Sequence, residues 1–315
     1  MHFDLADLRL FVHVAEAQNL TRGAARACLS PATASARVKS LEGQLGGSLF
    51  YRDSRGVTLT ALGQTLLLHA RIILRQVEHL KSACLSHGAD AVGSIRIFAN
   101  TTAVTEFMPE LLARFLATRP GVTVDLQERL TRDIVRGVLD GSSDLGIVSG
   151  PVPDAGLEVL HFSTDRLVMV TPAGHPLAQQ DSIAFSSALA YKQISLHDGS
   201  TLHAFLRDLL ERHGGSLALR IQVRSFEAMC RMIEAGVGIG LLPESAALRH
   251  QKTMQLCIVQ LQDDWALRER SVLVRELGAL PGCARALIDA LMQSGTGGSD
   301  SAGEHPNTLP ASRPG

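Results

Sequence analysis

The sequence of 315 residues predicts a multidomain protein with a small, mainly helical N-terminal unit, one long helix and a larger α/β unit. Three patterns along the chain indicate this division. Short helical segments fill about residues 1–60, one helical periodicity continues over 61–90, and strand-like runs alternate with helical runs over 91–293. A hydrophobic content of 45% is typical of a well-packed globular protein. Residues 294–315 are rich in Gly, Ser and Pro, which predicts a disordered tail.

Two helices joined by a tight turn are predicted between Asn19 and Glu42. Thr21 is placed to cap the first helix, in which Gly23 and the alanines that follow form a small face that a second helix can cross at close range. The second helix is expected to begin with Ser30 as its N-cap and with Pro31, which lacks an N–H, in its first turn. A helix pair of this kind places its second helix in a groove of DNA.

The second helix carries short polar side chains near its N-terminus and cations further along, an order that suits base edges first and phosphates second. After Gly46 and Gly47 a short hairpin is expected to act as a wing that presents two arginines to the DNA backbone. Taken alone, two arginines on a surface are more often ordinary solvated charges. The candidate DNA-contacting residues are Thr21, Ser30, Pro31, Ala32, Thr33, Ser35, Ala36, Arg37, Lys39, Arg52 and Arg55. Base contacts are expected from Ala32, Thr33, Ala36 and Arg37.

A long helix is predicted from Thr60 to about His87. Its apolar stripe has side chains spaced alternately three and four residues apart, and it is widened by Leu66, Ile73 and Leu80. The main stripe consists of Leu67, Ala70, Leu74, Val77, Lys81 and Cys84. The pattern indicates a helix that pairs with its copy in a homodimer; the alternative is a helix in the core of one chain. The net charge of −1 is low for a DNA-binding protein, which favours a dimer that doubles the contacts.

The second half of the chain alternates strands and helices, which predicts an α/β fold. The expected strands are Ser94–Ala99, Val122–Gln127, Leu145–Val148, Leu167–Val170, Ile221–Val223 and Gly238–Leu242, and the expected helices are Glu106–Ala117, Arg132–Leu139, Leu202–Arg212 and Phe226–Ala235. Such sheets bind ligands beyond the carboxyl ends of their strands. The loops expected to line one cleft contain Asn100, Thr101, Thr102, Arg129, Ser149, Gly199, Ser200 and Thr201. Because these loops are rich in donors and include Arg129, the expected ligand is a small anion such as a carboxylate.

One ordered set of N-terminal residues carries a resemblance to a known family. The set is Leu8-Arg-Leu-Phe11, Ala15-Glu16, Thr21-Arg-Gly-Ala24, Ser30, Ser35, Val38-Lys-Ser-Leu-Glu42, Leu45-Gly46, Leu49-Phe-Tyr-Arg52 and Leu59-Thr-Ala-Leu-Gly63. It resembles the winged helix-turn-helix of LysR-type transcriptional regulators. The chain departs from that pattern at Pro31, where the family often has glutamine, and at Ala36, where it often has arginine.

The second half is similar to the effector domain of the same regulators, which resembles a type 2 periplasmic binding protein with two lobes. The similar segments are Asp144-Leu-Gly-Ile-Val148, His175-Pro-Leu177 and Glu234-Ala-Gly-Val-Gly-Ile-Gly-Leu-Leu-Pro243. The resemblance implies a lobe one of about residues 93–162 and 267–292, and a lobe two of 163–266. It adds Phe226 to the residues expected near a small-molecule effector. Individually, the Ser and Thr residues in these loops are more often caps or turn residues.

The resemblance also implies a homodimer formed through the linker helix, commonly assembled to a homotetramer, on an imperfect inverted repeat in promoter double-stranded DNA. RNA polymerase is a further implied partner. No secretory pattern opens the chain and no apolar run approaches the ~20 residues that span a bilayer, so a cytoplasmic protein without membrane contact is expected. The five cysteines are odd in number and widely spaced, which is typical of reduced thiols.

Several other classes of function are not favoured. The glycines of Gly236-Val-Gly-Ile-Gly240 follow a helix and enter a strand, the reverse of the order in a dinucleotide-binding turn. The sequence contains neither H-E-x-x-H nor G-x-S-x-G, so no enzyme activity, cofactor or metal is expected. Two alternatives remain: a small-molecule binding protein or enzyme whose N-terminal helices serve only for oligomerisation, and a structural nucleoid protein that binds DNA without sequence preference.

Overall fold

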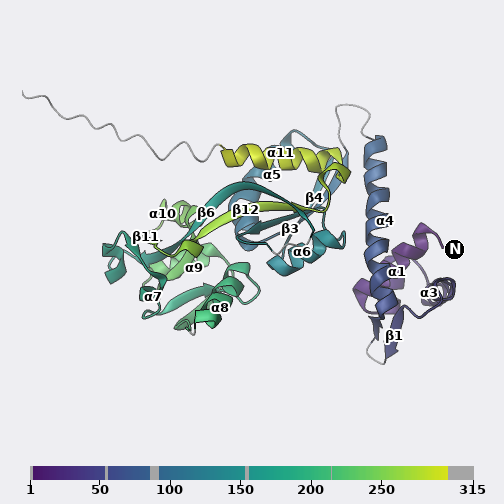
Figure 1. Cartoon of the computed structure of the whole chain (residues 1–315), viewed down its shortest axis with the longest axis horizontal. Helices are drawn as coiled ribbons and strands as arrows, with labels where there is room; N and C mark the ends of the chain where they lie inside the picture. Colours follow the sequence, from purple (N-terminus) through teal and green to yellow (C-terminus); the bar gives the residue numbers. More distant parts are fainter. Residues whose placement is uncertain (1–2, 54–55, 86–91, 153–155, 214, 297–315) are drawn as a thin grey trace, which may run out of the picture.

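A computed structural model describes residues 3–53, 56–85, 92–152, 156–213 and 215–296. It confirms the predicted fold class: a winged helical N-terminal domain, the long helix α4 and a two-lobed α/β domain follow one another along the chain (Figure 1). Arg55, the end of the expected long helix beyond Leu85, and most of the expected C-terminal tail lie outside the described residues. No helix in the described part of the chain combines the length and the apolar character that crossing a membrane requires.

The N-terminal domain packs three helices and a two-stranded antiparallel wing around one core. Its elements are α1 (Leu5–Ala17), α2 (Leu20–Arg26), α3 (Pro31–Leu45), β1 (Phe50–Asp53) and β2 (Gly56–Leu59). Fully buried Phe11 from α1 packs against Phe50 of the wing, with ring centroids 5.3 Å apart. Ala34, Val38 and Leu41 are the core-facing residues of α3, as their spacing predicts.

The boundaries of α3 agree with the sequence signals, whereas the cap of α2 does not. The Ser30 side chain accepts a hydrogen bond from the Thr33 N–H at 3.1 Å, and Pro31 is the first residue of the helix. The expected capping role of Thr21 is wrong. Asn19 caps α2 by accepting the Arg22 N–H at 2.9 Å, because α2 begins one residue before Thr21, at Leu20.

Replacing Gly23 with alanine is expected to destabilise the N-terminal domain by about 1–3 kcal/mol or more. A Cβ at this position would lie 2.5 Å from the Val14 Cα, so α1 and α2 would have to move apart. Gly43, on the exposed side of α3, is the matched control because a Cβ there meets nothing within 4 Å. Gly43→Ala should raise the free energy of unfolding by about 1 kcal/mol. Urea denaturation followed by circular dichroism checks both; equal stability of Gly23→Ala and the wild type would contradict the close crossing.

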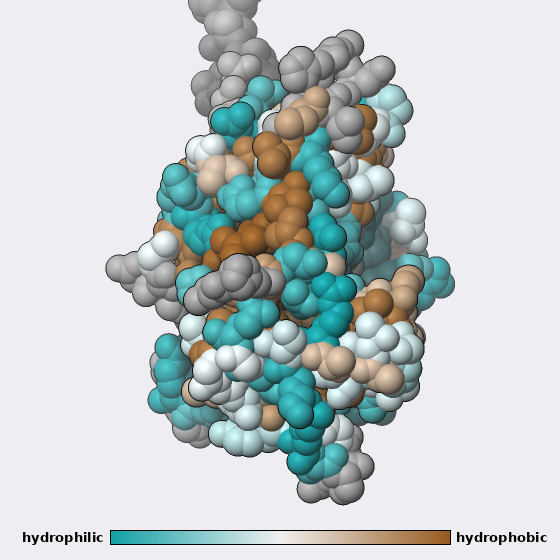
Figure 2. All heavy atoms as spheres, turned by 90° about the vertical axis from the view of Figure 1, so that its right-hand side faces the viewer, coloured by the Kyte–Doolittle hydropathy of each residue, from teal (hydrophilic) through white to brown (hydrophobic). Residues whose placement is uncertain are grey.

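The helix α4 (Ala61–Leu85) contacts both domains and leaves a third face uncovered. Leu67, Ala70 and Leu74 pack against the N-terminal core, so this part of the expected stripe is used within the chain. Arg71, Arg75 and His79 face the α/β domain. Among the described side chains of α4, the large apolar ones that stay exposed are Leu62, Ile73 and Leu80, which share one face, and Leu68, which lies about 120° around the helix from Leu80. Figure 2 shows hydrophobic residues gathered in a strip on the side of the molecule that carries α4.

The α/β domain is built on one eight-stranded sheet that runs through both lobes. The strand order is β4-β3-β5-β12-β6-β11-β7, and β10 also pairs with β6. The strands are β3 (Gly93–Ala99), β4 (Val122–Glu128), β5 (Leu145–Ser149), β6 (Glu158–Pro172), β7 (Ser182–Ile183), β10 (Gly240–Pro243), β11 (Leu256–Leu261) and β12 (Leu267–Val274). A parallel pair, β8 (Gln193–Leu196) and β9 (Leu219–Val223), lies beside the sheet in lobe two.

Helices cover the sheet in both lobes. In lobe one, a π-helical turn η1 (Ala103–Phe107) leads into α5 (Met108–Ala117), and α6 (Thr131–Leu139) and α11 (Gly282–Thr296) complete the layer. Lobe two contains α7 (Phe185–Ala188), α8 (Thr201–His213), α9 (Phe226–Glu234) and α10 (Glu244–Gln251). Figure 1 shows α11 and α5 on one side of lobe one and α6 on the other.

Two strands join the lobes at one place. The first part of β6 pairs with β12, and from Leu167 onward β6 pairs with β10 and β11 instead. In this hinge region, Leu267 is paired with Arg166, and Arg268 with Asp165. The sequence predicted only Leu167–Val170 as a strand here. The longer strand arises because β12, more than 100 residues away in the chain at every pair, supplies the partners for its first half.

Candidate nucleic-acid interface and inter-lobe cavity

The outer surface of α3 carries most of the predicted DNA-contacting side chains. Ala32, Thr33, Ala36 and Lys39 are exposed, together with the Ser30 and Pro31 that begin the helix, whereas Ser35 is half-buried. A helix held at its inner face by a core and at its N-terminus by a cap presents these short side chains in a fixed orientation. The geometry of a recognition helix is therefore present.

Arg37 differs from the other candidates because its guanidinium is already engaged. Its Nε donates to Asp7 Oδ1 at 2.7 Å, and its Nη2 donates to Asp4 Oδ1 at 3.1 Å. The hydrogen bond to Asp7 raises the pKa of Arg37. Asp4 and Asp7 also form the capping box of α1, so this arginine links the start of α1 to the middle of α3. The Nε and Nη2 groups of Arg37 could contact a base only after these bonds to Asp7 and Asp4 open.

The wing brings two of the predicted residues together. Thr21 at the start of α2 and Arg52 on β1 line the same surface hollow, together with Asn19 and Gly56. The Arg52 side chain stays half-exposed, with its guanidinium 3.9 Å from the Glu42 carboxylate. Arg55 falls outside the described residues.

Between the lobes, five of the predicted ligand residues do line one inner cavity: Asn100, Thr101, Thr102, Ser149 and Thr201. The Asn100 side chain donates to Ser149 Oγ at 2.9 Å and accepts the Ala103 N–H at 2.8 Å. The Thr101 hydroxyl donates to Glu128 Oε1 at 2.6 Å. These bonds join the loop after β3 to the last residues of β4 and β5. The α/β pattern predicted a ligand site at these carboxyl ends.

Four predicted ligand residues lie elsewhere. Phe226, only 1% exposed, is the first residue of α9 and packs in the core of lobe two beside Leu196 and Met229. Ser200 is fully buried as the cap of α8, where it accepts the His203 N–H at 3.1 Å. The Arg129 guanidinium donates to Gln127 Oε1 and lies over the Phe98 ring, and neither it nor Gly199 lines either inter-lobe cavity.

The sequence interpretation missed the two arginines that line the inner cavity, Arg166 and Arg268. Arg268 on β12 lines the inner cavity and also a larger outer cavity, which opens between the lobes and shares Ser149, Thr201 and Phe205 with it. Desolvation lowers the pKa of Arg268 to about 10. The only available signal was the strand β12, which the sequence interpretation did not place. Asp165, also at the inner cavity, pairs with Arg270 and accepts the Ser245 hydroxyl at 2.7 Å.

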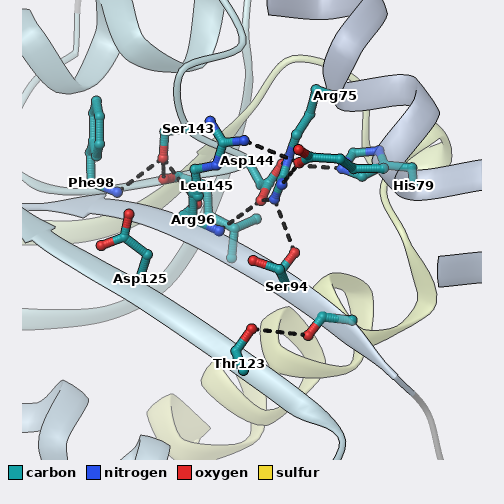
Figure 3. A network of polar contacts seen from close by, with 12 residues as sticks. Arg75, His79, Ser94, Arg96, Phe98, Thr123, Asp125, Ser143, Asp144 and Leu145 are labelled. Carbon is teal, nitrogen blue, oxygen red and sulfur yellow. Dashed lines mark hydrogen bonds and ion pairs between the residues drawn. The ribbon is translucent and has the colours of Figure 1, made fainter. Parts of the chain in front are cut away.

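A buried polar network fastens lobe one to α4 (Figure 3). The Asp144 carboxylate pairs with Arg75, is 3.2 Å from His79 Nε2 and accepts the Arg96 N–H at 2.7 Å. Arg75 also donates to the Ser94 carbonyl at 3.0 Å. Burial raises the pKa of Asp144, but its hydrogen bonds to His79 and Arg75 and the charge of Arg75 outweigh this and lower it to about 2. The carboxylate therefore stays ionised around neutral pH.

Comparisons with known proteins agree in both halves of the chain. Residues 5–64 match the family model described as "Bacterial regulatory helix-turn-helix protein, lysR family". Residues 88–296 match the model described as "LysR substrate binding domain". The HTH-type transcriptional regulator IlvY of Escherichia coli is 30% identical over 243 residues, which cover 76% of this chain and 82% of that protein. The HTH-type transcriptional regulator CzcR of Bacillus cereus is 31% identical over 248 residues, covering 77% of this chain and 81% of that protein.

Solved structures share the fold. A full-length OxyR from Pseudomonas aeruginosa superposes with a TM-score of 0.71 at 23% identity, covering 93% of this chain and 95% of that one. The regulatory domain of CcmR from Synechocystis, solved in complex with 2-PG, has a TM-score of 0.56 at 26% identity and covers 64% of this chain and 97% of that chain. The first similarity is to a full-length regulator and covers 93% of this chain, and the second is to a regulatory domain alone.

Proposed function

The chain belongs to the LysR family of bacterial transcriptional regulators, and from this we propose that it binds an imperfect inverted repeat in promoter DNA under the control of a small-molecule effector. The observation that carries the proposal is that α4 joins the domain that contains α3 to the domain that contains the inter-lobe cavity. The exposed face of α3 lies on one side of α4, and the inter-lobe cavity belongs to the domain fastened to its other side. An effector that favours one arrangement of the lobes would then bias the arrangement of the DNA-binding domains.

The working form that we propose is a homodimer through the exposed face of α4, assembled further to a homotetramer. Two-fold symmetry would place two α3 helices about one DNA turn apart, roughly 34 Å. RNA polymerase is a further proposed partner, and we place the protein in the cytoplasm. We propose no catalytic activity, which is consistent with relatives that are named transcriptional regulators.

The effector is proposed to bind between the lobes. Asn100, Thr101, Thr102, Ser149 and Thr201 line the inner cavity there, and their hydroxyl and amide groups suit a polar ligand. The CcmR regulatory domain, which has the same fold as this α/β domain, was solved in complex with 2-PG, and this supports a small-molecule effector for the present chain.

The test of DNA binding is a footprint of the purified protein on the DNA upstream of its own gene, at fixed salt and with non-specific competitor. A discrete protected inverted repeat is the expected result. Binding that disappears into competitor would contradict a sequence-specific regulator and favour a DNA-binding protein without sequence preference. No salt-dependent affinity at all would favour a binding protein whose N-terminal helices serve for oligomerisation.

Two substitutions should separate base recognition from backbone binding. Thr33→Ala on the exposed face of α3 is expected to lose about 1–3 kcal/mol of discrimination at one operator position. Arg52→Ala in the wing should weaken binding to every sequence and lower the salt slope by about one unit. Affinities for the operator and for single-base variants at several salt concentrations check both. The opposite pattern, with Arg52→Ala changing the base preference, would contradict this assignment of roles.

A further inference from the structure

Among the described residues, Arg268 is the one arginine that lines both inter-lobe cavities; Arg166 lines the inner one, and Arg132 and Arg207 line the outer one. Arg268 lies in the hinge region, paired in the sheet with Asp165, where β6 and β12 pass between the lobes. Its side chain lines the inner cavity and the outer cavity at once. Phe205, from α8 of lobe two, lines both cavities as well, so Arg268 and Phe205 form part of the wall between them. A group bound at Arg268 would therefore contact both lobes.

The guanidinium of Arg268 is held by close contacts on two sides. Its Cζ lies 4.0 Å from the centroid of the Phe205 ring, in a cation–π contact. On another side it rests against Gly150, where an added Cβ would be 2.4 Å from that same Cζ. Gly150 also has a φ of +87°, which favours glycine. The planar group is thus held in one orientation before any ligand arrives, which spares a ligand the entropy of ordering it.

The charge of Arg268 has no counterion among the described residues. Its Nη2 donates to the Ser149 carbonyl at 2.7 Å, and no carboxylate of the described chain pairs with it. Arg75 and Arg270, also well buried, are paired with Asp144 and Asp165 respectively. A partly buried cation without a counterion is unfavourable in the absence of a ligand, and an anion in the cavity would compensate it.

We propose that Arg268 anchors the effector by binding a carboxylate, and that the effector is an organic monocarboxylate with an apolar body. This proposal rests on the proposed effector cavity and names the class of ligand that it takes. The planar guanidinium of Arg268 suits a carboxylate in a two-hydrogen-bond pairing. Asp165 lines the same cavity together with Arg166, and its negative charge disfavours a ligand that carries a second one. Thr201 and Leu202, at the start of the 13-residue helix α8, add the partial positive charge of its N-terminus.

The two cavities indicate how such a molecule is accommodated. The inner cavity, of about 30 Å³, has room for little more than a small polar group or ordered water. The outer cavity, of about 630 Å³, is within the usual range for ligand sites. Its apolar lining includes Leu130, Val135, Pro151 and Ala204. The carboxylate is therefore placed at Arg268, near the hydroxyls of the inner cavity, and the apolar body extends into the outer one.

The experiment uses the fluorescence of Trp265, the single tryptophan of the sequence, whose ring centroid lies 5.7 Å from that of Phe205. The full-length protein is titrated with sodium hexanoate at constant ionic strength, and in parallel with hexanamide and inorganic phosphate. A saturable change with hexanoate is expected. Hexanamide should bind about 10- to 100-fold more weakly, because it lacks the charge that pairs with the guanidinium. Phosphate should cause no saturable change.

Substitutions of Arg268 test whether the fluorescence response to hexanoate depends on this residue. Arg268→Gln should weaken hexanoate binding about 10- to 100-fold, and Arg268→Lys, which keeps the charge but loses the planar fork, should fall between it and the wild type. The matched control is Arg129→Gln, because the Arg129 guanidinium is stacked on Phe98 and Arg129 lines neither cavity. This variant should bind hexanoate like the wild type. Thermal melts verify that each variant is folded. If Arg268→Gln does not fold, hexanoate binding by Arg268→Lys tests the role of Arg268 instead.

Three results would overturn the proposal: equal binding of hexanoate and hexanamide, unchanged hexanoate binding in folded Arg268→Gln or Arg268→Lys, or no saturable response of the wild type up to about 50 mM hexanoate. Saturable phosphate binding that depends on Arg268 would contradict the choice of a carboxylate. These titrations contain no DNA. A failure here with an intact operator footprint therefore refutes only the ligand class, whereas a failed footprint with intact hexanoate binding refutes the proposed regulator.

Discussion

Replacing Leu80 with glutamate is expected to convert the proposed dimer to monomers and to weaken operator binding by about 100-fold or more. Leu80 is 63% exposed, and Ile73, 43% exposed, precedes it by two helical turns on the same face of α4. Burying one such side chain contributes about 1.5–3 kcal/mol, and symmetry makes each residue count twice. A glutamate at this position would also have to lose its hydration in the interface. Each monomer would retain only half of the DNA contacts.

Leu68 on the same helix provides the matched control. It is also an exposed leucine, 37% accessible, but a separation of 12 residues turns it about 120° around the helix from Leu80. Leu68→Glu should leave both the mass in solution and the operator affinity close to those of the wild type. Sedimentation velocity and footprinting with the two variants test the prediction. A dimer that survives Leu80→Glu but not Leu68→Glu would move the interface to another face of α4.

Replacing Asp144 with asparagine is expected to lower the free energy of unfolding of the α/β domain and its docked helix by about 3–5 kcal/mol. Arg75, which is only 6% exposed, would keep its charge without the buried carboxylate that now compensates it. A double variant, Arg75→Met with Asp144→Leu, removes both charges and should recover a large part of this loss. Urea midpoints of the three proteins at neutral pH measure the difference. Wild-type stability of Asp144→Asn would contradict the buried pair.

The same pair predicts a pH dependence with a definite sign. Folding lowers the pKa of Asp144 from its ordinary 3.8 to about 2, so the ionised carboxylate binds its proton less readily in the folded state. The resulting stabilisation, about 2 kcal/mol, is fully present above the ordinary pKa and is lost as the pH falls from there through the folded pKa. The difference in stability between wild type and Asp144→Asn should therefore shrink as the pH falls through this window. A difference that stays constant from neutral pH to pH 2 would contradict the lowered pKa.

Local signals in the sequence were sufficient for the elements that depend on neighbouring residues. The Ser30 cap with Pro31 in the first turn, the core spacing of Ala34, Val38 and Leu41, and the end of α3 at Gly46 agree with the structure. Capping bonds and helical faces arise between residues a few positions apart, so the sequence pattern carries them. The sequence also predicted that Asn100 and Ser149, at the ends of two strands, line one cavity, and they do. This prediction needed only the position of each strand end, because sheets of α/β folds place their clefts there.

Only the tertiary structure decided which charged groups are paired and which remain available. Arg37 meets Asp4 from 33 residues earlier, and Arg75 meets Asp144 from 69 residues later, separations over which no periodicity acts. Arg129 was predicted at the inter-lobe cavity from its place after a strand. Arg268 lines that cavity instead, from the hinge region that forms only when β12 pairs with β6. By itself the sequence therefore determined the family, the fold class and the helical recognition unit. The partners of its buried charges depend on contacts between distant segments, which come into being when the domains pack.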